Sequence, residues 1–300
     1  MSTEISNLLP KKTCQLAVYA LLLVIVGILG LTYSKARHVM TNHALLKAIG
    51  EKNIVAVTDA LNRGADPNTI LERMHDQDDV PEQFGVHEIV KQLMGKSPQG
   101  DRWTALMLAA QGGETDVVKL LLDRKAAINV QNKGGSTALS LAAEEGHIGV
   151  VRLLLQHDAN VSIAAFDSDT SLSDTALSLA SQASHTEIVN MLLDRGANVN
   201  RIDNNGYTPL YWAVYEGDLE MVKILLSHGA KAGTKGKNVR SPLSEAAFSG
   251  QYAITKALIN SGADANAVAD SGVTPLCTAE MMGHPDIVAL LKKAGAKEEK

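Results

Sequence analysis

The sequence predicts an all-α solenoid of about seven helix–turn–helix repeats with short β-hairpin loops, preceded by one N-terminal transmembrane helix. Three observations lead to this prediction. A short pattern recurs about every 33 residues over most of the chain, and 20 uncharged, mostly apolar residues occur together near the N-terminus. Aromatic residues make up only 4% of the chain while hydrophobic residues make up 45%, which favours helices packed by small and aliphatic side chains.

Charge and cysteine content exclude several classes of function. The 300-residue chain has 28 Lys and Arg against 33 Asp and Glu, a formal charge of −5. This balance gives no indication of electrostatic binding to nucleic acid. Its two cysteines, Cys14 and Cys277, cannot form a disulfide framework or a closed zinc site. We therefore expect no nucleic-acid partner, no metal, no cofactor and no small-molecule substrate.

The first predicted element is a transmembrane helix at residues 14–33, which follows a tail at 1–13 and precedes a linker at 34–41. Its 20 residues, CQLAVYALLLVIVGILGLTY, carry no charge and span roughly 30 Å as a helix, which is the thickness of a bilayer core. The alternative is a signal peptide cleaved after Ala36, although the apolar stretch is longer than usual for one. Three basic residues after the segment against two before it favour a cytoplasmic location for the rest of the chain, with a periplasmic or secreted location as the alternative.

Six later segments share one pattern, a Thr or Ser followed by a small residue and Leu. They are spaced by 33, 38, 33, 33 and 33 residues. The Thr or Ser is expected to cap a short inner helix, with Pro in its first turn in three copies. A paired apolar face such as Val117-Val118 with Leu120-Leu121-Leu122 predicts a second helix, and a Gly-Ala turn ends it. The six pattern starts are Thr104, Thr137, Thr175, Thr208, Ser241 and Thr274.

This combination of period, cap and turn resembles the ankyrin repeat family. An earlier turn at Gly64-Ala65 gives a seventh copy, so the resemblance covers residues 42–297, with a short tail at 298–300. The resemblance implies stacked helix pairs that bury a continuous core and present a concave groove to protein partners. Lys292 and Lys293 are suited to a solvated C-terminal cap.

The sequence departs from the family pattern in three ways. The family's His after Thr-Pro-Leu is absent from every copy, so the hydrogen bonds that it makes in relatives are not expected here. Lys125 and Asp158 replace the glycine that ends the second helix, and we expect a left-handed backbone at both. Insertions interrupt the period near residues 71–98 and 165–174, and the first contains His75 and His87 among several acidic residues.

Candidate partner-binding residues follow from the resemblance. It implies that the residue before each cap and the residue at the exposed end of each inner helix face the groove. Aromatic rings and Arg dominate the energy of many interfaces, so the large side chains at these positions are the candidates. The alternative is that Tyr211 and Trp212 pack between helices, with Trp212 facing the core. The candidates at these positions are Trp103, Tyr207, Tyr215, Arg240, Phe248 and Met281, and the neighbouring Tyr211 is added to them.

The predicted function is a noncatalytic scaffold or adaptor that binds protein partners and is tethered to a membrane by one helix. The first alternative is a secreted or periplasmic ankyrin-repeat protein whose signal peptide has been removed. The second is an enzyme or metal site in the 71–98 insertion, where His75 and His87 lie near carboxylates in a spacing that matches no known metal signature.

Overall fold

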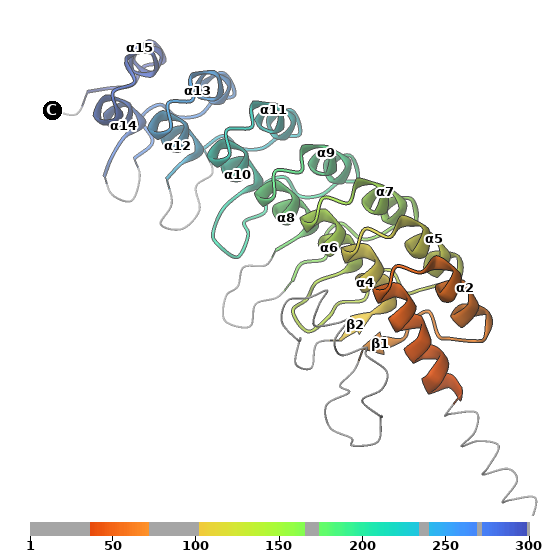
Figure 1. Cartoon of the computed structure of the whole chain (residues 1–300). Helices are drawn as coiled ribbons and strands as arrows, with labels where there is room; N and C mark the ends of the chain where they lie inside the picture. Colours follow the sequence, from red (N-terminus) through yellow and green to blue (C-terminus); the bar gives the residue numbers. More distant parts are fainter. Residues whose placement is uncertain (1–36, 72–101, 166–173, 234–239, 269–271, 299–300) are drawn as a thin grey trace, which may run out of the picture.

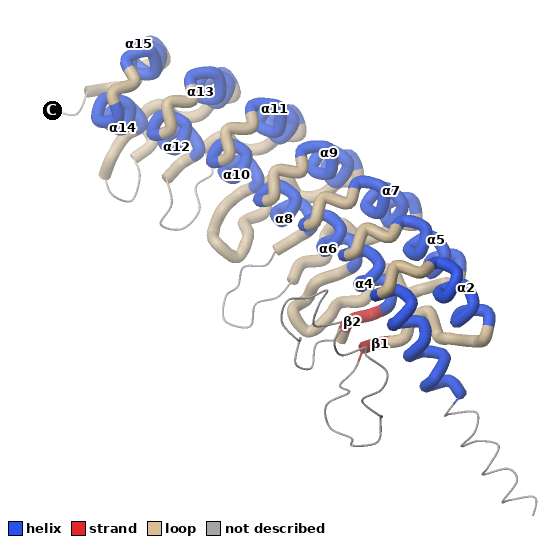
Figure 2. The backbone as a smooth tube through the Cα atoms, viewed as in Figure 1, coloured by secondary structure: helices blue, strands red, loops and turns tan. Residues whose placement is uncertain are grey.

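A computed structural model describes residues 37–71, 102–165, 174–233, 240–268 and 272–298 (Figure 1). The chain forms a curved row of antiparallel helix pairs in two layers, with the loops projecting from the inner layer (Figures 1 and 2). The predicted all-helical repeat solenoid is therefore confirmed.

Each repeat contributes one helix to each layer. The inner layer contains a helix at residues 37–50, then α4 (Ala105–Gln111), α6 (Ala138–Glu144), α8 (Ala176–Gln182), α10 (Pro209–Tyr215), α12 (Pro242–Phe248) and α14 (Pro275–Met282). The outer layer contains α2 (Ile54–Asn62), α5 (Thr115–Asp123), α7 (Ile148–Gln156), α9 (Thr186–Asp194), α11 (Leu219–Ser227), α13 (Tyr252–Asn260) and α15 (Pro285–Lys293).

The inner helices begin as predicted. The hydroxyl of each capping Thr or Ser accepts the backbone N–H three residues later at 3.1–3.3 Å. In two repeats the residue in place of the family's His completes a capping box, because the hydroxyls of Ser140 and Ser178 accept the cap's own N–H at 2.8 Å. Serine thus satisfies backbone groups at the start of these helices.

One continuous apolar core lies between the two layers. Inner helices contribute fully buried alanines such as Ala109 and Ala142, which let neighbouring helices approach closely. Outer helices contribute a recurring buried leucine at equivalent positions, and each strong helix contact joins helices of the same repeat or of adjacent repeats. No repeat buries its apolar face alone, so stability depends on stacking.

The turns after the outer helices have the predicted conformation. Lys125 and Asp158 have φ of 66° and 60°, the left-handed region that glycine adopts at the equivalent position of other repeats. Lys52 and Ser184, which follow the first inner helix and α8, also have positive φ, at 55° and 59°. The sequence reasoning identified the first two positions and missed the last two.

Antiparallel pairing brackets both insertions. Strand β1 (Ile70–Leu71) pairs with β2 (Trp103–Thr104), so Ile70 lies opposite Thr104 across the first insertion. An isolated bridge joins Ala164 to Thr175 across the second. Residues 72–101 and 166–173, which make up most of the insertions, lie outside the described residues.

Within the described ranges, no helix combines the length and the apolar character that crossing a bilayer requires. The predicted transmembrane segment at residues 14–33 lies outside those ranges.

Candidate protein-binding site

Three tyrosines form a ladder along α10 and the loop before it. The rings of Tyr207 and Tyr211 stack with centroids 4.4 Å apart, and those of Tyr211 and Tyr215 stack at 6.3 Å. The ladder arises because residues four apart lie on one face of a helix. It runs from the hairpin loop to the exposed end of α10, so it crosses the full width of the inner layer.

Trp212 lies edge-on to this ladder and connects it to the hairpin loop through a hydrogen bond. Its ring makes edge contacts with Tyr207 and Tyr215 at 5.0 and 5.9 Å, and its indole N–H donates to Asp203 at 2.6 Å. The other oxygen of the buried Asp203 carboxylate accepts the backbone N–H groups of Asn205 and Tyr207. One buried carboxylate therefore fixes both the loop and the indole ring.

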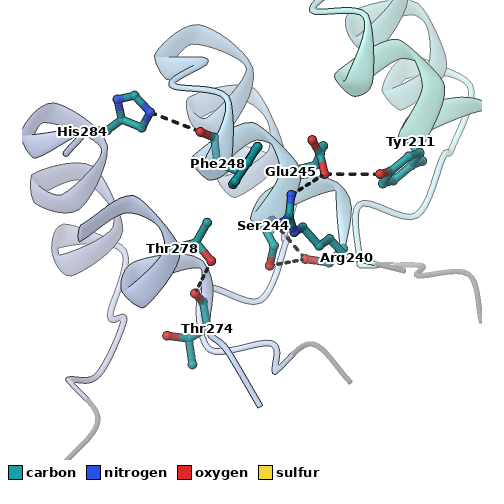
Figure 3. A network of polar contacts seen from close by, with 9 residues as sticks. Tyr211, Arg240, Ser244, Glu245, Phe248, Thr274, Thr278 and His284 are labelled. Carbon is teal, nitrogen blue, oxygen red and sulfur yellow. Dashed lines mark hydrogen bonds and ion pairs between the residues drawn. The ribbon is translucent and has the colours of Figure 1, made fainter. Parts of the chain in front are cut away.

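A second buried carboxylate, Glu245 on α12, connects the ladder to the next repeat (Figure 3). The hydroxyl of Tyr211 donates to its Oε2 at 3.3 Å, and the guanidinium of Arg240 lies 3.4 Å from the same oxygen. Burial, followed by the neighbouring negative charge of Glu245, raises the pKa of Tyr211 well above its usual range. The phenol therefore remains protonated and continues to donate.

Arg240 also lies over the ring of Phe248, with its guanidinium carbon 4.0 Å from the ring centroid. Such cation–π contacts stabilise an exposed pair by about 0.5–1 kcal/mol. The backbone carbonyl of Phe248 accepts a hydrogen bond from His284 of the next repeat at 3.2 Å (Figure 3). The Arg240–Phe248 pair is therefore held from two sides, by Glu245 and by the last repeat.

The structure separates the candidate residues into two groups. Tyr215 and Met281 are 55% and 66% exposed, Arg240 is exposed, and Tyr207 and Phe248 are half-buried. Trp103 and Tyr211 are buried, Trp103 in the paired strand β2 and Tyr211 against Glu245, so neither presents its ring to a partner. The expectation that Trp212 faces the core is also wrong, since it is half-buried beside the ladder.

Sequence reasoning missed Asp203 and Glu245. A signal for Glu245 was present, because it occupies the helix position that is Leu108 and Leu141 in earlier repeats, and a charged residue at an apolar position requires partners. Asp203 takes the place of Asn132, whose side chain caps its own hairpin loop in the same way.

Two carboxylates with altered pKa, Glu144 and Asp174, lie in the repeats before α10. Partial desolvation of the exposed Glu144 carboxylate raises its pKa, and the negative charges of Glu145 and Asp174 raise it further. Burial also raises the pKa of Asp174. The described residues contain no group of three or more His, Cys, Asp or Glu side chains able to hold a metal ion.

Comparison with known proteins decides the family. A family model described as ankyrin repeats matches three segments, residues 82–167, 163–236 and 231–300, which together span well over half of the chain. The chain belongs to the ankyrin repeat family. Ankyrin repeats generally mediate protein–protein interactions, and the family is typically noncatalytic.

Two solved ankyrin repeat domains are similar in fold. One from Acinetobacter baumannii AYE is 28% identical with a TM-score of 0.59, covering 64% of this chain and 98% of its own. The human ASB11 ankyrin repeat domain is 22% identical with a TM-score of 0.62, covering 82% of this chain and 96% of its own. No curated protein matches the chain in sequence.

Proposed function

We propose that this ankyrin protein is a noncatalytic adaptor that is tethered to a membrane by residues 14–33 and binds a protein partner on its inner layer. The binding site is the aromatic surface, defined as Tyr207, Tyr215, Arg240, Phe248 and Met281. The observation that supports this choice most directly is the exposure of Tyr215 and Met281 on either side of the fixed Arg240–Phe248 pair.

Rigidity favours this surface as a binding site. Ordering a flexible side chain on binding costs about 0.5–1.5 kcal/mol, and side chains that are already held avoid much of this cost. Tyr207 is held by stacking on Tyr211, and Arg240 is held by Glu245 and Phe248. A partner that covers these groups would bury large apolar area at small cost in conformational entropy.

Proximity labelling from the intact, anchored protein would identify the partner, and alanine variants would then test the surface. We expect Tyr215→Ala and Phe248→Ala each to weaken partner binding by roughly 1–3 kcal/mol, measured by calorimetry. The control is Glu144→Ala, an exposed inner-helix residue in an earlier repeat, which should have a smaller effect. Circular dichroism should confirm that the half-buried Phe248 is dispensable for folding.

Binding at wild-type affinity by both folded variants would show that the aromatic surface is the wrong site. The insertion at residues 71–98 would then become the leading candidate.

The proposed tether rests on the length, the absence of charge and the mostly apolar character of residues 14–33. The intact protein should remain in the membrane fraction after a carbonate wash, whereas deletion of residues 1–33 should release a folded domain. A mature N-terminus at Arg37 would instead demonstrate a cleaved signal peptide. We also propose that the ankyrin domain faces the cytoplasm, in which case protease added outside intact cells should leave it whole.

A further inference from the structure

Both ends of the ankyrin array carry exposed polar and exposed apolar side chains. At the C-terminal end, Lys292 pairs with Glu280 at 3.4 Å and with Glu298 at 2.6 Å, and Lys293 is exposed. Terminal repeats need such polar outer faces because no further repeat covers them. The exposed apolar side chains of this end, Met281 and Met282, lie on α14, and Met281 belongs to the aromatic surface.

The N-terminal end exposes large apolar side chains on both of its helices. On the helix at residues 37–50, Val39 and Met40 are 65% and 72% exposed, and on α2 Val55 is 75% exposed. This helix pair lies at the end of the described array opposite α14 and α15 (Figure 2). Exposed large apolar side chains on a terminal helix pair indicate a contact surface.

A groove between these two helices adds positive charge to the apolar face. Its lining includes Arg37 and Met40 from the first helix and Asp59 and Arg63 from α2. Arg63 forms a two-bond pair with Asp59 at 2.9 and 3.0 Å, which compensates the only acidic residue of the lining. Two arginines against one aspartate leave the groove with a net positive charge.

The position of this face along the chain identifies what covers it. The apolar segment ends at Tyr33, and four Cα–Cα steps later Arg37 begins the described helix. Four steps reach at most roughly 14 Å. If residues 14–33 span a bilayer, the exposed apolar face is therefore held at the surface of that bilayer.

We propose that the N-terminal face, defined as Arg37, Val39, Met40 and Val55, docks on the lipid surface of the membrane that holds the tether. Val39, Met40 and Val55 insert among the headgroups, as the apolar faces of interfacial helices do, and Arg37 binds lipid phosphate. This inference rests on the proposed tether. It adds that the first repeat contacts the membrane directly, so that the array is not connected to the membrane by a flexible linker alone.

The test uses the full chain reconstituted into phosphatidylcholine vesicles with and without phosphatidylserine. Cys14→Ser and Cys277→Ser remove the native thiols, and serine already occupies the position of Cys277 in three other repeats. A fluorophore is attached through Val55→Cys or, as the matched control, through Ala253→Cys. Ala253 is the exposed residue at the equivalent position of α13, far along the array.

We expect brominated lipid to quench the label at residue 55 at least about twice as strongly as the label at residue 253. Met40→Asp should abolish this difference while the chain still floats with the vesicles. Arg37→Gln should remove any increase in quenching that phosphatidylserine produces, because a cation near the surface gains about 1 kcal/mol from anionic lipid, roughly a fivefold change in occupancy.

Three results would overturn the proposal. If the chain floats with vesicles but the two labels are quenched equally, the face does not dock although the tether stands. If the chain does not float, the tether fails and the docking with it. If Val55→Cys instead forms a disulfide between two copies and its label is insensitive to brominated lipid, the face binds a second copy of the chain.

Discussion

Every repeat has a left-handed backbone at the second residue after the outer helix. Five repeats place glycine there, and two place Lys125 and Asp158, with φ of 66° and 60°. A side chain resists this conformation because its Cβ approaches the neighbouring carbonyl oxygen. Each of these residues therefore carries a conformational cost that glycine would avoid.

Lys125→Gly and Asp158→Gly should each raise the free energy of unfolding by roughly 0.5–1 kcal/mol. The measurement is the midpoint of denaturant unfolding. Gly196→Ala is the reverse control, since Gly196 has φ of 81° at the equivalent turn and nothing within 4 Å of an added Cβ. Midpoints that fall in the glycine variants would show that the side chains contribute more than their backbones cost.

The left-handed turns illustrate how much of the fold the sequence could predict. Lys125 and Asp158 were identified because the period aligned them with glycines in other repeats. Ser184 was not, because it belongs to a second set of turns, after the inner helices, where the requirement depends on the following repeat. Burial of Trp103 was also missed, since it lies in strand β2 and pairs with a strand on the far side of a long insertion.

The aromatic surface was predictable in position but not in detail. Period and side-chain type were enough to select Tyr215 and Met281, which are exposed. The buried Asp203 and Glu245 could not be assigned partners from sequence, because these partners come from a loop and from the adjacent repeat. Which rings remain available to a partner therefore depends on contacts between repeats.

Between helices, a histidine at the start of three outer helices connects adjacent repeats. The Nε2–H groups of His147, His185 and His284 donate to inner-helix carbonyls of the preceding repeat at 2.8, 3.0 and 3.2 Å. Each ring lies against a left-handed glycine of that repeat, so that a Cβ at Gly146 would be 2.5 Å from the His185 ring. Where the following repeat has Asp218 instead of His, the turn residue is Ser184 rather than glycine.

Gly146→Ala should therefore destabilise the array more than Gly262→Ala. Both glycines have positive φ, but only the first is in contact with a histidine ring, while nothing lies within 4 Å of a Cβ added at Gly262. We expect about 1 kcal/mol from the backbone in both variants and a further 1–3 kcal/mol from overpacking at Gly146. Thermal unfolding monitored by circular dichroism would measure the difference.

The double variant Gly146→Ala with His185→Ala is the control for this interpretation. Removing the ring should relieve the overpacking and leave the backbone cost together with the loss of one hydrogen bond, about 1 kcal/mol. If the effects of Gly146→Ala and His185→Ala on the free energy of unfolding simply add in the double variant, the two residues are not coupled. The ring would then have no part in the requirement for glycine.

At the scale of the whole molecule, the array places its proposed functions at different distances from the membrane. Adjacent helices pack about 8–10 Å apart, so four repeats separate the N-terminal face from α10 by roughly 30–40 Å. The aromatic surface extends from Tyr215 on α10 to Met281 on α14, near the free end of the array. A partner bound there would be held clear of the bilayer, and one of its contact residues, Met281, would lie in the last repeat, which has a neighbour on one side only.

This arrangement predicts that two equivalent leucines contribute differently to the stability of the array. Leu154 on α7 and Leu291 on α15 occupy the same repeat position and are both fully buried, but Leu291 has a neighbouring repeat on one side only. In a linear array, stability is the sum of repeat terms and nearest-neighbour terms, so the last repeat can unfold alone. Leu154→Ala should lower the stability of the whole array by about 2–5 kcal/mol. Leu291→Ala should mainly unfold α14 and α15.

Hydrogen exchange measured by mass spectrometry separates the two outcomes. In Leu291→Ala, amide protection should fall in α14 and α15 and remain close to wild type in α6 and α8, whereas in Leu154→Ala it should fall throughout. Because α14 carries Met281 and His284 holds the carbonyl of Phe248, Leu291→Ala should also weaken partner binding without any change in the surface residues themselves. Equal loss of protection in α6 and α8 in both variants would mean that the array unfolds as a single cooperative unit, and partner affinity would then follow global stability rather than the stability of the last repeat.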